Sequence, residues 1–177
     1  VIRRVGKVAG LESELSNIDS DATCGIGHTR WATHGRPSVV NAHPHTSCDG
    51  RIAIVHNGII ENFAELREEL VGRGHVFKSE TDTEVVAQLI EYFYQGDILE
   101  AVGRVLRRIE GAYALGILCA DFPDQLIAVR KDSPLILGYG DGCNFLASDV
   151  TAVIKHTRDV SYMEDGEIAV LTADSIK

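Results

Sequence analysis

Residues 51–62 read Arg-Ile-Ala-Ile-Val-His-Asn-Gly-Ile-Ile-Glu-Asn, and the spacing of their apolar residues changes along the stretch. Polar and apolar residues alternate from 51 to 56, as they do in a half-buried strand. The pair Asn57-Gly58 is typical of a turn, so we expect it at the end of that strand. From Asn62 the pattern is helical, with Asn62 placed as the N-cap and Glu65 three residues later. A strand that leads into a helix therefore begins this part of the fold.

Two more helices are predicted downstream of this one. The second begins at Thr81 or Asp82, where Thr81 and Glu84 have the spacing of a capping box, and it runs to Phe93. The third covers residues 97–109, with an aspartate as its cap and apolar residues along one face. Asp82 is thereby placed at a helix N-terminus.

After Gly111 the chain changes to short strands separated by turns rich in Asp, Gly and Pro. The predicted strands cover residues 113–119, 125–130, 135–139, 144–147 and 167–171, with a helical turn within 149–156. Such short connections permit only antiparallel pairing. Runs of helices flanked by runs of strands indicate an α+β fold rather than a βαβ repeat.

The composition limits the classes of function. A chain of 177 residues suffices for one domain with a real core. The net charge is −9 and the basic residues are scattered, so we expect no nucleic-acid partner. The longest apolar stretches, such as residues 112–120, are far below the roughly 20 residues that span a bilayer, so we expect no membrane partner and no signal peptide. Four cysteines without a C-x-x-C pair indicate reduced thiols and a cytoplasmic location.

Histidines are concentrated in one part of the chain: five of the seven lie within residues 28–56. Histidine clusters bind metals, and His43 and His45 share a face if the chain is extended there. However, Pro44 breaks a regular strand, and no recognised ligand spacing with a carboxylate or cysteine is present. We therefore expect no metal and no other cofactor.

A free amino acid requires a cation for its carboxylate, an anion for its ammonium group, and donors for an oxyanion formed at its side chain. Arg30 and Asp82 would supply the two charges, because the arginine fork binds a carboxylate in bidentate fashion. The Asn57 side-chain amide and the Gly58 backbone N–H would supply the donors of an oxyanion hole. An Asn-Gly pair by itself is equally typical of an ordinary turn.

Four polar blocks stand in the chain in a characteristic order. They are His28-Thr-Arg-Trp-Ala-Thr-His34, Asn41-Ala-His-Pro-His45, His56-Asn-Gly-Ile-Ile-Glu-Asn62 and Ser79-Glu-Thr-Asp-Thr-Glu84. Together they closely resemble the class II glutamine amidotransferases, and within that class the sugar-phosphate branch of the glucosamine-6-phosphate synthases. The resemblance extends over almost the whole chain.

The resemblance implies an N-terminal-nucleophile hydrolase fold, in which two antiparallel sheets are stacked between helical layers (αββα). It implies that residues 1–177 are a single glutamine amidotransferase domain whose substrate and product are L-glutamine and L-glutamate. Arg30 would bind the glutamine α-carboxylate and Asp82 the ammonium group. Asn57 and Gly58 would form the oxyanion hole.

A loop that folds over bound glutamine in the family matches the first block. It contains Trp31, Thr33 and His34, and Trp31 would shield the site and contact the rest of the enzyme. In the complete enzyme, ammonia from glutamine passes to sugar isomerase domains, where fructose 6-phosphate becomes glucosamine 6-phosphate. Those domains, the expected partners, are absent from the 177 residues.

The sequence departs from the family at its first residue. The family begins with cysteine, which supplies both the thiolate and, through its free α-amine, the base. The sequence here begins at Val1, so we expect the first strand and helix of the domain to be missing and the chain to be inactive as it stands. Cys24 precedes a glycine as the family's nucleophile does, but we expect a buried thiol on a strand there, with no α-amine to act as base.

Two other interpretations remain open. A module without a nucleophile would bind glutamine or glutamate and not hydrolyse it. A class II amidotransferase of another branch would deliver ammonia to a different acceptor.

Overall fold

The computed structural model describes residues 1–31 and 33–177, so that Ala32, within the first of the four blocks, lies outside the described residues. In chain order the elements are α1 (Val8–Leu15), β1 (His45–Thr46), β2 (Ile52–Ile60), α2 (Phe63–Gly72), α3 (Thr83–Phe93), α4 (Ile98–Leu106), β3 (Gly111–Cys119), β4 (Leu126–Lys131), β5 (Ile136–Tyr139), β6 (Asn144–Ala147), the 3-10 helix η1 (Val150–Ala152), β7 (Val160–Tyr162) and β8 (Ile168–Leu171).

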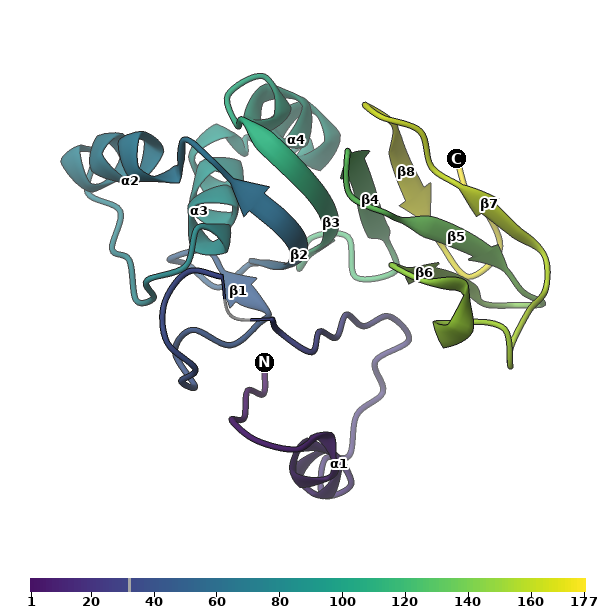
Figure 1. Cartoon of the computed structure of the whole chain (residues 1–177). Helices are drawn as coiled ribbons and strands as arrows, with labels where there is room; N and C mark the ends of the chain where they lie inside the picture. The colour runs from purple at the N-terminus through teal and green to yellow at the C-terminus, as the bar shows by residue number, and fades with distance from the viewer. Residues whose placement is uncertain (32) are drawn as a thin grey trace.

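The strands form two antiparallel sheets. The larger has the order β1-β2-β3-β4-β8, and the smaller has the order β6-β5-β7. Helices α2, α3 and α4 lie on one side of the larger sheet, and the smaller sheet lies on its other side (Figure 1). The predicted α+β class with two antiparallel sheets is confirmed.

Alternation along β3 explains why the larger sheet is covered on both faces. Leu115 and Ile117 point to the helices and belong to the core between α2–α4 and the sheet. Ala114 and Leu118 point the opposite way, into a second core that the two sheets share. Successive side chains of a strand point to opposite faces, so one strand supplies both cores. Each fully buried leucine or isoleucine contributes about 1.5–3 kcal/mol.

Strand β2 does not end where the sequence predicts. It continues through the Asn57-Gly58 pair to Ile60, with Asn57 opposite Ala114 and Gly58 opposite Tyr113 on β3. The prediction of a turn is therefore wrong. Pairing with the long strand β3 satisfies the backbone of these residues and overrides their local turn preference.

Gly58 has a conformation and surroundings that admit no side chain. Its φ is +125°, and a Cβ built there would lie 2.0 Å from the carbonyl oxygen of Ala112. We expect Gly58→Ala to lower the free energy of unfolding by about 2–4 kcal/mol, through backbone strain and displacement of β3. Denaturant unfolding measures the change. Gly103→Ala on α4, where the nearest atom is a flexible Arg107 nitrogen at 3.9 Å, is the matched control and should be neutral or stabilising. Equal free energies of unfolding for the two variants would contradict the claim that Gly58 admits no side chain.

The helices lie close to their predicted positions, but two of the caps differ. Asn62 makes no capping hydrogen bond. Its amide instead donates to the Arg108 carbonyl and accepts from the Glu110 N–H, which ties the start of α2 to the segment before β3. The predicted Thr81–Glu84 box is also wrong, because Glu84 accepts hydrogen bonds from the backbone of Ser79 and its neighbour Lys78.

The third helix ends earlier than its hydrophobic pattern suggests. Asp97 caps α4 as predicted, accepting from the Glu100 N–H at 3.0 Å, but α4 stops at Leu106 rather than at Ile109. Three short elements were not predicted, namely α1, β1 and β7. Each is eight residues or fewer, which leaves little room for a periodic pattern.

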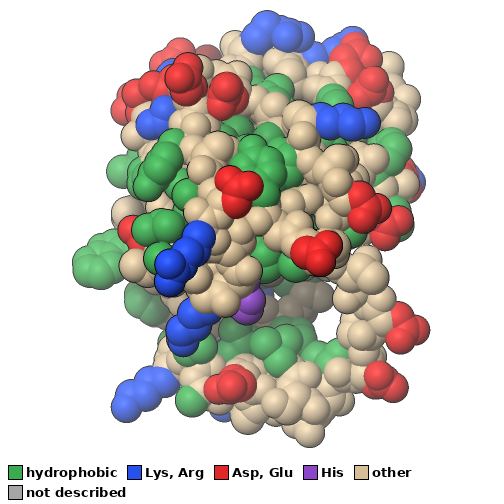
Figure 2. Space-filling model, turned by 90° about the vertical axis from the view of Figure 1, so that its right-hand side faces the viewer, with side chains coloured by type: hydrophobic (Ala, Val, Ile, Leu, Met, Phe, Trp, Pro, Cys, Tyr) green, Lys and Arg blue, Asp and Glu red, His purple; other side chains and the backbone are tan. Residues whose placement is uncertain are grey.

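Charges are mixed on the surface. On the face shown in Figure 2, acidic and basic side chains are interspersed rather than separated by sign. None of the helices in residues 1–31 and 33–177 combines the length and the apolar character that crossing a membrane requires.

Candidate active site

A cavity of about 90 Å³ lies where residues 28–31 and Thr33 meet strand β2 and the start of α3. All of the predicted site residues except His34 line it: Arg30, Trp31, Thr33, Asn57, Gly58 and Asp82. The remaining lining residues are His28, His43, His56, Thr81 and Thr83. Residues from distant parts of the sequence thus surround one space.

Asn57 is held at the cavity by a histidine. His28 Nε2 lies 2.7 Å from the Asn57 side-chain oxygen. Burial lowers the pKa of His28 despite the opposing effect of this hydrogen bond, so the ring is neutral at pH 7. With the proton on Nε2, the ring donates to Asn57 Oδ1, which leaves the Asn57 amide N–H groups as donors for a ligand.

Arg30 is half-buried and shapes the loop that carries it. Its Nη2 donates to the backbone carbonyls of His34 and Gly35, the latter at 2.8 Å. A guanidinium group has five N–H donors, so these two bonds do not exhaust it. Arg30 therefore places a positive charge at the cavity while it holds the backbone of His34 and Gly35.

Asp82 supplies the negative charge. It is 3% exposed, and its Oδ2 accepts from the Ile60 N–H at 2.9 Å. Two histidine nitrogens stand farther off, His34 Nδ1 at 3.8 Å from Oδ1 and His56 Nδ1 at 4.0 Å from Oδ2. Asp82 lies directly before α3, at the positive end of the helix dipole.

The remaining loop residues lie differently from one another. Trp31 lines the cavity, yet 89% of its surface is exposed. His34 lies outside the cavity lining, but its ring contacts Phe63 at a centroid distance of 4.9 Å. The backbone carbonyl of His34 also accepts from Arg30. The exposed Trp31 is thus free to cover a ligand, whereas His34 supports the loop.

Three further histidines, His43, His45 and His56, are buried at the cavity, and two of them, His43 and His56, line it. His43 stacks on His28 at 4.3 Å and contacts His45 at 4.9 Å between ring centroids. His45 Nε2 lies 3.1 Å from Thr81 Oγ1, and His56 Nδ1 lies 3.0 Å from the Thr83 hydroxyl. Burial lowers the pKa of His43 to about 2 and that of His45 and His56 to about 4. These rings hydrogen-bond and stack as neutral groups.

Sequence reasoning did not assign a role to His28. The signal was present, because His28 and Arg30 are two residues apart and share a face of an extended chain. The contact with Asn57 joins residues 29 positions apart, and only the folded chain brings them together. Thr81 and Thr83 were missed in the same way.

Comparison with known proteins identifies the family. A family model described as a glutamine amidotransferase domain matches residues 28–155. The chain belongs to this family. The amidotransferase domain is also 59% identical over 97% of its length to a glutamine--fructose-6-phosphate aminotransferase [isomerizing] of Caldanaerobacter subterraneus subsp. tengcongensis. The relative of that name from Thermococcus kodakarensis is 51% identical over 99% of the domain.

The alignments cover almost all of this chain but only part of the length of each relative. The chain spans 28% and 29% of the length of these two proteins. Among solved structures, the glutamine phosphoribosylpyrophosphate amidotransferase of B. subtilis has a TM-score of 0.69 and 26% sequence identity, over 85% of this chain and 33% of its own. The resemblance to the sugar-phosphate branch and the N-terminal-nucleophile fold are therefore confirmed.

Proposed function

We propose that this domain binds L-glutamine and provides the glutaminase part of a glutamine--fructose-6-phosphate aminotransferase. The glutamine amide is hydrolysed to glutamate and ammonia. In the full-length protein the ammonia passes to fructose 6-phosphate and yields glucosamine 6-phosphate. Support comes from the names of the relatives, and above all from one cavity that holds a cation, an anion and an amide donor together.

The cavity is complementary to a free amino acid. Arg30 would bind the α-carboxylate and Asp82 the ammonium group, which places the side-chain amide of glutamine toward Asn57. The Asn57 amide and the Gly58 N–H would then donate to the oxygen that becomes negative during attack. Trp31 and Thr33 would cover the bound amino acid, with His34 supporting the loop.

Arg30→Ala is expected to raise KM for glutamine about 10–100-fold, because a hydrogen bond to a charged group contributes about 1.5–3 kcal/mol. Steady-state glutaminase kinetics of the full-length protein measure it. The exposed Arg36 in the same loop lies outside the cavity lining, so Arg36→Ala is the control.

A glutamine analogue without an α-carboxylate separates binding from loop support. If Arg30 contacts the carboxylate, Arg30→Ala should affect glutamine far more than the analogue. An equal loss for both compounds would show that Arg30 only holds the loop.

The nucleophile is the remaining requirement. No cysteine of the described chain lines the cavity. Cys24, half-buried and outside any strand, has its pKa raised by burial, which disfavours the thiolate. We therefore propose that the 177 residues alone do not turn glutamine over.

The test of the proposed function compares two proteins. We expect glutamate release from the full-length protein and none from residues 1–177 alone, and N-terminal sequencing of the full-length protein should show cysteine first. Absence of glutaminase activity in a full-length protein that begins with cysteine would refute the proposal.

Residues 1–177 would act as a single domain whose partners are isomerase domains of the same protein. This organisation is supported by the small fraction of the relative's length, 28%, that the chain covers. The four cysteines are free, which agrees with a cytoplasmic location.

A module that binds glutamine without hydrolysis is the second candidate. It is favoured by the lack of a cysteine among the described residues that line the cavity. Calorimetry distinguishes it: glutamine binding that Arg30→Ala abolishes, together with no turnover by the full-length protein, would establish the binding module.

A further inference from the structure

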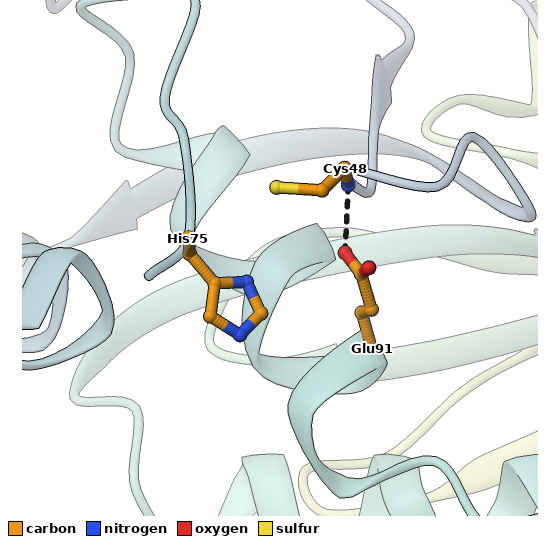
Figure 3. Close-up of side chains that lie close together, drawn as sticks. All are labelled: Cys48, His75 and Glu91. Atoms are coloured by element: carbon orange, nitrogen blue, oxygen red, sulfur yellow. Dashed lines mark hydrogen bonds between the residues drawn. The ribbon is translucent and has the colours of Figure 1, made fainter. Parts of the chain in front are cut away.

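Cys48, His75 and Glu91 come together on the surface, away from the glutamine cavity, whose lining includes none of them. Cys48 lies in the turn after β1, His75 in the connection between α2 and α3, and Glu91 in the last turn of α3. One ligand atom from each lies within 4.8 Å of those from the other two. Figure 3 shows the three side chains around a common space.

A buried amide joins two of these groups. Gln88 Oε1 lies 3.0 Å from Cys48 Sγ and 3.0 Å from His75 Nδ1. Gln88 is 1% exposed and lies on α3, three residues before Glu91, so both face the same side of the helix. The amide holds the sulfur and the imidazole close together, which is the usual task of groups behind a metal site.

Backbone N–H groups contact the third ligand, Glu91, and the Cys48 sulfur. The Cys48 N–H donates to Glu91 Oε2 at 2.6 Å, which fixes the carboxylate and leaves its second oxygen available. The Val76 N–H lies 3.3 Å from Cys48 Sγ and donates to it. The thiolate is the form of cysteine that binds metals.

We propose that Cys48, His75 and Glu91 bind a Zn²⁺ ion, with Gln88 Oε1 beside the fourth position. Sulfur, imidazole nitrogen and carboxylate oxygen are the three ligand types that Zn²⁺ accepts in tetrahedral sites. Binding replaces the Cys48 thiol proton, which is released to solvent, with a sulfur–zinc bond. The ion would join the turn after β1, the α2–α3 connection and the end of α3.

The site serves structure rather than the hydrolysis of glutamine. Asp82 directly precedes α3, Glu91 lies near the end of that helix, and His45 of β1 lies three residues before Cys48. A zinc ion at this position would tie the turn after β1 to α3, the helix whose first residue, Thr83, lines the cavity. None of the three ligands lines the cavity, so zinc binding does not depend on whether the domain hydrolyses glutamine.

Titration with Co²⁺ in place of Zn²⁺ tests the site in metal-free full-length protein. A thiolate ligand produces a sulfur-to-cobalt charge-transfer band. We expect the band in the wild type and in Cys143→Ser, which removes another exposed, free cysteine, and its loss in Cys48→Ser. Zn²⁺ should displace the cobalt. His75→Gln should keep the thiol and weaken metal affinity at least about tenfold.

Alkylation provides a second measurement that requires no variant. At Zn²⁺ ten times above its dissociation constant, Cys48 should react with iodoacetamide about tenfold more slowly, whereas Cys143 should react unchanged. Peptide mass spectrometry measures both rates in one sample. An equal cobalt band in the wild type and Cys48→Ser, or an unchanged alkylation rate of Cys48, would overturn the proposal.

Discussion

Asn57→Ala is expected to lower kcat for glutamine hydrolysis by the full-length protein by about 10²–10³, with KM nearly unchanged. Removal of one oxyanion donor has an effect of this size, because the donor acts mainly on the charge that develops in the transition state. The effect depends on the orientation of the Asn57 amide. His28 Nε2 hydrogen-bonds to the Asn57 oxygen at 2.7 Å, so the amide nitrogen faces the ligand.

Asn57→Asp is the matched variant, since it keeps the shape and the acceptor for His28 but replaces the donor with a carboxylate. We expect a loss of kcat at least as large as that of the alanine variant, with an unchanged unfolding midpoint. A full kcat in either variant would eliminate the oxyanion-hole assignment of Asn57.

Acid should destabilise the domain strongly, because His43, His45 and His56 are buried as neutral rings. Burial lowers their pKa to about 2, about 4 and about 4, respectively, from the ordinary value of 6.5. Between pH 6.5 and 4 the unfolded chain therefore binds more protons than the folded one, and stability falls as the pH falls. From pH 7 to pH 5 the loss is about 2 kcal/mol per histidine.

Denaturant unfolding at several pH values measures this loss. His45→Gln, which keeps a polar partner for Thr81, should make stability less dependent on pH between 7 and 5. His156, exposed and stacked on Phe145, is the control, and His156→Gln should leave the dependence unchanged. Stability that stays constant down to pH 5 would show that the buried histidines are charged in the folded protein.

Local patterns predicted most of the elements. Helix α3 and strand β6 lie where periodicity placed them, since amphipathic spacing reflects the core that each element covers. The errors arose where long-range pairing overrode local preference. Asn57-Gly58 is a turn pair by composition, yet β3 pairs with it and makes it part of a strand.

The sequence predicted which residue types form the candidate site, but not how they are arranged in space. Charge complementarity selected Arg30 and Asp82, and both line one cavity. Their roles in binding stay predictions until the kinetics are measured. His28 was missed because its importance lies in one contact with Asn57, which no local pattern encodes.

The sequence by itself determined the fold class, the family resemblance and the residue types that an amino-acid site requires, because periodicity and ordered polar blocks are local properties of a chain. Only the tertiary structure decided which groups meet. In the folded chain His28 contacts Asn57, and β3 packs against Gly58. Cys48 lies close to His75 and Glu91. Those contacts link positions 27 to 55 residues apart in the printed sequence, and they form because strand pairing and core burial bring distant segments together.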